Sequence, residues 1–253
     1  MGYWTAPDGV RIAYEVYGAG SPVILLHGLA SSSSVNWIRP GVIDALVGQD
    51  FEVVAYDARG HGESSKPHEP AAYARGTMEA DASGLIGSLG YEQVYLIGYS
   101  MGAQVAAGLA ASDARVQRLV LGGIGPGMVT RSPSDARERS LEMAEALEAE
   151  RVDDVSETTP RAFRAFADAT GADRLALAAI ERSGALDAPV DLGRIGVPTL
   201  LIAGSEDRMA GDVQELAGVY HGVDVVTVPG DHMSAVTKPE FAKAVVEFLQ
   251  AGS

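Results

Sequence analysis

The chain has 253 residues, of which 47% are hydrophobic and 21% charged, a composition typical of a globular protein. Its net charge of −15 argues against nucleic acid and against an anionic membrane surface as partners. The absence of cysteine excludes disulfides, thiolate metal sites and cysteine nucleophiles, and no apolar run approaches the roughly 20 residues that span a bilayer. We therefore expect a reduced, cytoplasmic protein that acts on a small molecule.

The predicted elements begin with a β-hairpin, because the turn signal Pro7-Asp8-Gly9 precedes the alternating run Val10–Tyr17. Short apolar runs then alternate with helix-length stretches, which predicts a doubly wound α/β fold with a mostly parallel sheet. The expected strands are Val23–Leu26, Glu52–Tyr56, Gln93–Ile97, Arg118–Leu121, Thr199–Ala203 and Val223–Val228. The expected helices are Val35–Val47, Tyr73–Leu89, Met101–Ser112, Ala210–His221 and Pro239–Gln250.

One region interrupts this alternation. Between about Gly127 and Gly196 there is no good strand, and helical runs such as Ala136–Arg151, Pro160–Ala169 and Arg174–Arg182 appear instead. Long ordered insertions usually have a function, so we expect a helical cap over residues 127–196 rather than a solvated surface excursion. The core would then comprise residues 1–126 and 197–253.

A nucleophile is indicated by Gly98-Tyr99-Ser100-Met101-Gly102, a G-x-S-x-G pattern between a predicted strand and a predicted helix. The pattern alone is weak, because a chain with 30 glycines is expected to contain roughly 0.2–0.3 such matches by chance. Its placement is more specific, since a strand that turns directly into a helix presents the serine at the carboxyl edge of the sheet. The alternative is a serine that only caps the helix.

A serine nucleophile needs a base, usually a histidine held by a carboxylate. His232 follows the predicted strand Val223–Val228, in a loop at the same edge of the sheet. Asp207 follows the strand Thr199–Ala203 and is the expected acid, with the adjacent Glu206 as the alternative. The order Ser100, Asp207, His232 along the chain is the one this architecture uses.

Two further motifs also lie directly after predicted strands. His27-Gly28 follows the first parallel strand, and Asp57-Ala58-Arg59-Gly60-His61-Gly62 follows the second. Over nearly its whole length the chain resembles the α/β-hydrolase superfamily, with residues 127–196 the least matched part. The resemblance implies an oxyanion hole formed by the backbone N–H groups of Leu29 and Met101. It also implies that Asp57, Arg59 and His61 support the oxyanion loop, although Arg59 could bind a substrate carboxylate if it reached the pocket.

The reaction that fits best is acyl transfer to Ser100 followed by hydrolysis, with a carboxylic ester as substrate. Relatives that open epoxides or remove halides use aspartate at the nucleophile position, which argues against both chemistries here. Carbon–carbon bond hydrolysis of a diketone-like substrate stays open, as does non-hydrolytic catalysis by a lyase, a cyclase or a cofactor-free oxygenase. We expect no cofactor and no metal, since the sequence suggests no cluster of metal ligands.

The residues that line the substrate pocket are harder to predict from the sequence. Phe163 and Phe166 stand three residues apart, so they share one face of a predicted helix and are expected to line the acyl pocket. Met128 and Trp37 are further candidates for contact with substrate. For all four residues, ordinary packing between cap and core is the alternative.

Overall fold

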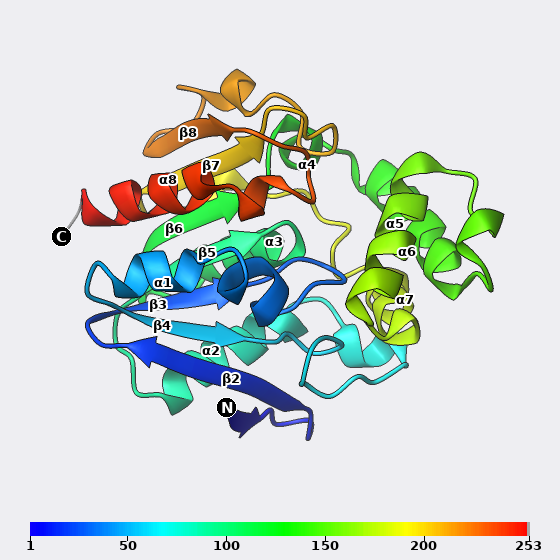
Figure 1. The fold of residues 1–253 in the computed structure, drawn as a ribbon, viewed down its shortest axis with the longest axis horizontal. Coiled ribbons are helices and arrows are strands. Elements are labelled where there is room, and N and C mark those ends of the chain that lie inside the picture. The colour runs from blue at the N-terminus through cyan, green and yellow to red at the C-terminus, as the bar shows by residue number, and fades with distance from the viewer. Residues whose placement is uncertain (252–253) are drawn as a thin grey trace.

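The computed structural model describes residues 1–251 and shows one eight-stranded sheet between two layers of helices (Figure 1). The strand order is β1-β2-β4-β3-β5-β6-β7-β8; β2 runs antiparallel to both of its neighbours, and all other pairs are parallel. This confirms the predicted α/β class. The strands are β1 (Gly2–Thr5), β2 (Arg11–Gly18), β3 (Ser21–Leu26), β4 (Phe51–Tyr56), β5 (Val94–Tyr99), β6 (Val116–Gly122), β7 (Thr199–Gly204) and β8 (Val223–Val228).

Both faces of the central strands are buried, which explains their unbroken apolar runs. Along β3, Val23 and Leu25 pack into one hydrophobic cluster and Ile24 and Leu26 into the other, because successive side chains of a strand point to opposite faces. One cluster is closed by α1 (Val42–Val47) and α8 (Pro239–Gln250), and the other by α2 (Thr77–Ser88) and α3 (Met101–Ala110) (Figure 1).

Three predicted helices differ from the structure. The prediction of a helix over Ala210–His221 is wrong, since only a single 3-10 turn forms there and glycines at 211, 218 and 222 adopt positive φ. The predicted helix Val35–Val47 is interrupted after a π-helical turn, because Pro40 lacks an N–H donor and Gly41 has a φ of 78°. In the same way, α2 begins only after Gly76, whose φ is 85°.

The shorter helical turns are the π-helical turn Ser34–Ile38 and the 3-10 turns Pro70–Tyr73, Val152–Asp154, Leu192–Arg194, Val213–Leu216 and Ala235–Thr237. Among residues 1–251, no helix is both long enough and apolar enough to cross a membrane.

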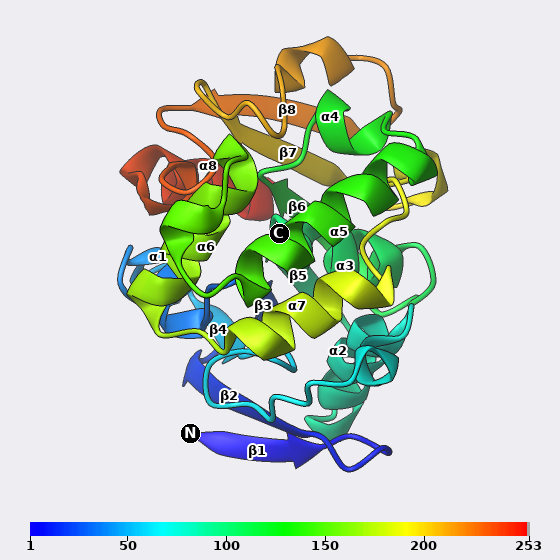
Figure 2. The same ribbon diagram turned by 90° about the vertical axis from the view of Figure 1, so that its right-hand side faces the viewer.

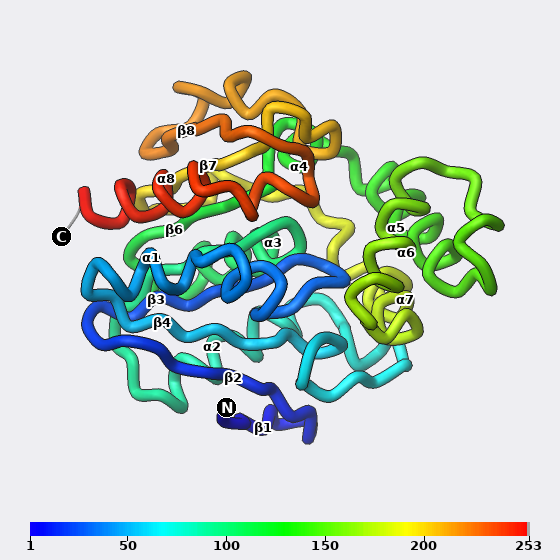
Figure 3. The backbone as a smooth tube through the Cα atoms, in the orientation of Figure 1, coloured from blue at the N-terminus to red at the C-terminus, as the bar shows by residue number. Residues whose placement is uncertain are grey.

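The chain leaves the core after β6 and returns before β7, as the backbone trace shows (Figure 3). Its helices there are α4 (Pro126–Val129), α5 (Pro133–Glu148), α6 (Thr158–Thr170) and α7 (Arg174–Ser183). Viewed from that side, α5, α6 and α7 lie in front of the carboxyl ends of the parallel strands (Figure 2). On α5 the charged side chains are exposed and the apolar ones buried, as the amphipathic pattern predicts; these are Glu138, Arg139, Glu142 and Glu145 against Ala144 and Leu147, with Leu141 half-buried.

Besides apolar packing, three polar contacts tie this segment to the core. The Thr170 hydroxyl donates to the Ala30 carbonyl oxygen at 2.9 Å, and the Gly127 N–H donates to the Ala210 carbonyl oxygen at 2.9 Å. His68 pairs with Asp173 at 3.0 Å. Residues 127–196 therefore contact the loops that surround the carboxyl ends of the strands.

Candidate active site

Ser100 occupies the sharp turn between the end of β5 and the start of α3. Its φ of 51° and ψ of −113° are strained for a residue with a side chain. The flanking glycines make this turn possible. A Cβ at Gly98 would lie 2.4 Å from the Gly102 carbonyl oxygen, and one at Gly102 would lie 2.1 Å from the Leu26 carbonyl oxygen. The G-x-S-x-G pattern thus reflects the close approach of β3, β5 and α3.

The structure brings Ser100, His232 and Asp207 together from three different strand ends. His232 Nε2 lies 2.8 Å from Ser100 Oγ, and His232 Nδ1 lies 2.8 Å from Asp207 Oδ2. All three residues are at most 7% exposed. This is a continuous hydrogen-bonded chain from carboxylate through imidazole to hydroxyl, the arrangement that lets an imidazole take a proton from serine.

The carboxylate of Asp207 is fixed by its own loop. Asp207 Oδ1 accepts hydrogen bonds from the backbone N–H groups of Met209 and Ala210, each at 3.0 Å, which leaves Oδ2 for the imidazole. The neighbouring Glu206 is exposed, and its side chain makes no hydrogen bond or ion pair within residues 1–251. Tyr99 completes the support, since its hydroxyl donates to the His232 carbonyl oxygen at 2.8 Å.

The oxyanion loop runs beside the nucleophile. A Cβ placed on Gly28 would lie 3.5 Å from Ser100 Cβ, and the Gly28 N–H donates to Asn36 Oδ1 at 2.8 Å. Within the described residues, the backbone N–H groups of Leu29 and Met101 have no hydrogen-bond acceptor. Both groups are therefore free to donate to a negatively charged oxygen, as an oxyanion hole requires.

Two buried histidines hold this loop against the second motif. His27 Nε2 accepts from the Ala58 N–H at 3.0 Å, and its Nδ1 lies 2.9 Å from the Gly28 carbonyl oxygen. His61 Nε2 accepts from the Ala30 N–H at 3.3 Å, and its Nδ1 lies 3.1 Å from the Arg59 carbonyl oxygen. A ring nitrogen that accepts a hydrogen bond carries no proton, so both rings are neutral and bear their proton on Nδ1.

Burial of these rings makes stability depend on pH. Burial lowers the pKa of His61 from 6.5 to about 3, with a further contribution from the adjacent His27, whose own pKa burial also lowers. The unfolded chain takes up a proton below pH 6.5 while the folded chain does not, so stability is present above pH 6.5 and is lost as the pH falls toward 3.

We therefore expect the free energy of unfolding to fall by about 2 kcal/mol between pH 7 and pH 5 through His61 alone. Denaturant titrations at both pH values test this in the wild type and in His61→Asn, which should lose that part of the decrease. The exposed His221 provides the control, and His221→Asn should keep the full decrease. An unchanged pH dependence in His61→Asn would contradict the assignment.

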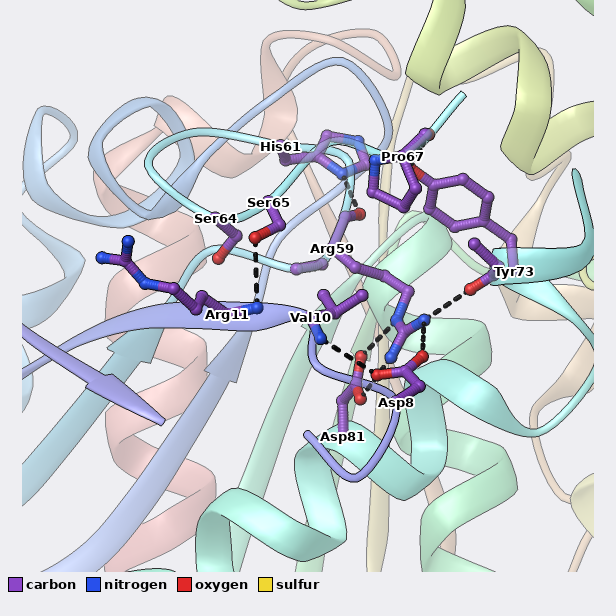
Figure 4. A network of polar contacts seen from close by, with 12 residues as sticks. Asp8, Val10, Arg11, Arg59, His61, Ser64, Ser65, Pro67, Tyr73 and Asp81 are labelled. Atoms are coloured by element: carbon purple, nitrogen blue, oxygen red, sulfur yellow. Dashed lines mark hydrogen bonds and ion pairs between the residues drawn. The ribbon is translucent and has the colours of Figure 1, made fainter. Parts of the chain in front are cut away.

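Arg59 does not reach the cavity. Figure 4 shows its guanidinium enclosed by acids, with Nε 2.6 Å and Nη2 2.8 Å from the two carboxylate oxygens of Asp81 and Nη1 2.8 Å from Asp8. The residue is 1% exposed. Asp57 is likewise used structurally, since its two oxygens accept from the N–H groups of Ser33 and Glu63, each at 2.8 Å. Neither side chain is available to a substrate.

A cavity of about 460 Å³ opens at Ser100 between the core and residues 127–196. Leu29, Met101, Met128 and Phe163 line it, so the structure places four of the predicted site residues in the same cavity as the nucleophile. Phe163 also lines a neighbouring hollow of about 990 Å³, and its ring centroid lies 6.2 Å from that of His232. Phe166 lines a void of about 20 Å³ that touches Ser100 and His232.

The prediction that Trp37 contacts substrate is wrong. Its side chain is fully buried in the cluster closed by α1 and α8, with its ring 6.4 Å from that of Phe241. Because Trp37 lies in the π-helical turn before α1, its side chain points into this cluster and not into the cavity. Asn36, whose Oδ1 accepts from the Gly28 N–H, was not predicted from the sequence; a polar residue among the apolar ones of a predicted helix was the available signal.

Comparisons with known proteins agree with this geometry. A family model described as the alpha/beta hydrolase fold matches residues 21–144. The non-heme haloperoxidase of Rhodococcus erythropolis is 29% identical over 235 residues, which are 83% of each chain.

Two solved structures resemble the whole chain. A hydrolase from Pseudomonas aeruginosa PA01 has a TM-score of 0.79 and 28% identity over 98% of this chain and 97% of that one. The enol-lactonase from Burkholderia xenovorans LB400 has a TM-score of 0.72 and 26% identity over 98% of this chain and all of that one. With its nucleophile turn and sheet topology, the chain belongs to the α/β-hydrolase superfamily.

Proposed function

We propose that the protein is a serine hydrolase that cleaves a carboxylic ester of a small molecule through an acyl-enzyme. The observation that carries the proposal is the hydrogen-bonded chain Ser100–His232–Asp207, whose serine lines a cavity. We further propose that residues 127–196 form a cap, because they cover the strand ends and supply one wall of that cavity. The enol-lactonase similarity supports acyl chemistry, since a lactone is a cyclic ester.

In the proposed reaction, Ser100 Oγ attacks the ester carbonyl carbon while His232 Nε2 takes the hydroxyl proton. The carbonyl oxygen becomes an oxyanion that accepts from the N–H groups of Leu29 and Met101. His232 then passes its proton to the leaving alcohol, and the ester bond breaks. Water attacks the acyl-enzyme by the same steps, and the carboxylic acid leaves. Asp207 holds the imidazole with Nδ1 protonated and stabilises its positive charge.

A fluorophosphonate probe and a panel of p-nitrophenyl esters of increasing chain length test this function. Labelling at Ser100 together with turnover of at least one ester would support ester hydrolysis. Labelling without turnover of any ester would instead favour carbon–carbon hydrolysis or non-hydrolytic catalysis. If neither labelling nor turnover occurred, a reactive serine would be excluded.

Phe163 is expected to set the chain-length preference, because it lines both the 460 Å³ cavity and the 990 Å³ hollow. Phe163→Ala should enlarge both spaces and raise kcat/KM for longer acyl chains relative to short ones. Phe166→Ala should enlarge only the small void and change the preference less. The measurement is kcat/KM across the ester panel for each variant.

Phe248→Ala on α8 is a matched control, since this half-buried ring lies against Arg118 and away from the cavity. It should leave the preference unchanged. Equal losses on every ester in Phe163→Ala, with a lower Tm, would show that Phe163 acts only in packing.

A further inference from the structure

The cavity at Ser100 has a second polar region. Three arginines line it in addition to the residues already described: Arg131 just before α5, Arg139 on α5, and Arg208 directly after Asp207. Two of them come from the segment that covers the strand ends and one from the core. No part of the triad mechanism uses any of them.

Within residues 1–251, none of these three arginines has a partner at ion-pair or hydrogen-bond distance, although Glu181 acts on Arg131 at longer range. No carboxylate there lies within 4.0 Å of their guanidinium groups, and their side chains make no hydrogen bond. Arg131 Nε is in addition buried from solvent. By contrast, the buried Arg59 and Arg164 are held by carboxylates and backbone carbonyl oxygens.

Unpaired arginines in a cavity are unexpected in this chain, because its 34 acidic residues outnumber the 19 Lys and Arg. A buried N–H donor without an acceptor costs free energy, so a ligand oxygen that reached Arg131 Nε would recover a hydrogen bond that the protein alone does not supply. Burial and the adjacent Arg139 lower the pKa of Arg131, while the more distant Glu181, Asp187 and Asp135 act in the opposite direction.

Three glutamates also line the cavity, and they must be weighed against the arginines. Glu142 and Glu157 are exposed, as are Arg139 and Arg208, so solvent screens these four charges and Arg131 is the less exposed cation of the cavity. Glu181 is buried and faces Arg131 and Arg137, together with Asp187 and Ser140. Burial raises the pKa of Glu181 to about 7, with a smaller contribution from Asp187, so its carboxyl ionises less readily than an exposed one. The negative charge that Glu181 presents to Arg131 is thereby weakened.

We propose that Arg131, assisted by Arg139, binds a carboxylate on the substrate while its ester group lies at Ser100. The substrate class is then an ester or lactone whose acid part carries a second, free carboxylate. A guanidinium suits this role, because its N–H groups match the two oxygens of a carboxylate. The cavity volume of about 460 Å³ admits a small dicarboxylic half-ester. This inference rests on the proposed ester hydrolysis for its reaction, but its binding step can be measured alone.

The kinetic test compares mono-p-nitrophenyl adipate with the neutral p-nitrophenyl hexanoate. The wild type should prefer the adipate. Arg131→Gln should lower kcat/KM for the adipate by about 10- to 100-fold and for the hexanoate by less than about 3-fold. Arg39→Gln, which removes an exposed arginine outside the cavity, should change neither value. Equal losses on both esters in Arg131→Gln would overturn the proposal.

Calorimetric binding of adipate at pH 7 separates this proposal from the hydrolase proposal, because it requires no turnover. The wild type and Arg39→Gln should bind adipate, and Arg131→Gln should bind it at least about 10-fold more weakly. Binding that depends on Arg131 without cleavage of any ester would preserve the carboxylate site and exclude ester hydrolysis. Ester cleavage with no adipate binding, or with binding unaffected in Arg131→Gln, would overturn the carboxylate site alone.

Discussion

Ser100→Ala is expected to lower kcat for the best ester by about 10⁴- to 10⁶-fold while the protein stays folded. The variant keeps the Cβ and the strained φ of 51°, so the turn between β5 and α3 is preserved. It removes only the oxygen that lies 2.8 Å from His232 Nε2. Without that oxygen no acyl-enzyme can form, and the remaining rate comes from the oxyanion hole and binding alone.

Steady-state kinetics and a thermal melt measure the two parts of this expectation. Ser88→Ala is a suitable control, because its hydroxyl donates to the Leu85 carbonyl oxygen on α2, far from the cavity. It should retain full activity. A Ser100→Ala protein that kept most of its turnover would show that another group attacks the substrate.

The features that could be predicted from the sequence are those in which local geometry dictates residue type. Apolar runs indicated strands buried on both faces, and the glycines around Ser100 indicated a turn too tight for side chains. Since parallel strands end at one edge of the sheet, the positions of Asp207 and His232 after β7 and β8 were enough to place them near Ser100.

The features that could not be predicted depend on packing between distant segments. The run Ala210–His221 has helical composition, but its glycines adopt left-handed backbone instead. Trp37 looked like a pocket residue, and only the three-dimensional fold places it against Phe241. Arg131, just before α5, and Glu181, on α7, are separated by fifty positions and line the same cavity only because α5 and α7 pack together.

Asp207→Asn is expected to lower kcat by about 10³- to 10⁴-fold with little change in structure. Its side-chain oxygen would still accept from the N–H groups of Met209 and Ala210, as Asp207 Oδ1 does. The amide nitrogen would then face His232 Nδ1, where the carboxylate oxygen lay at 2.8 Å. Two donors cannot pair, so the imidazole would move its proton to Nε2 and could no longer accept the proton of Ser100.

Glu206→Gln is the matched control, because it makes the same chemical change on the preceding residue, whose side chain is exposed and unpaired within residues 1–251. It should change kcat by less than about 3-fold, since an exposed carboxylate has little effect across solvent. Both variants should retain the wild-type Tm within a few degrees. If Glu206→Gln lost the larger share of activity, Glu206 would be the acid that orients His232, and the loop after β7 would have to rearrange during catalysis to bring it there.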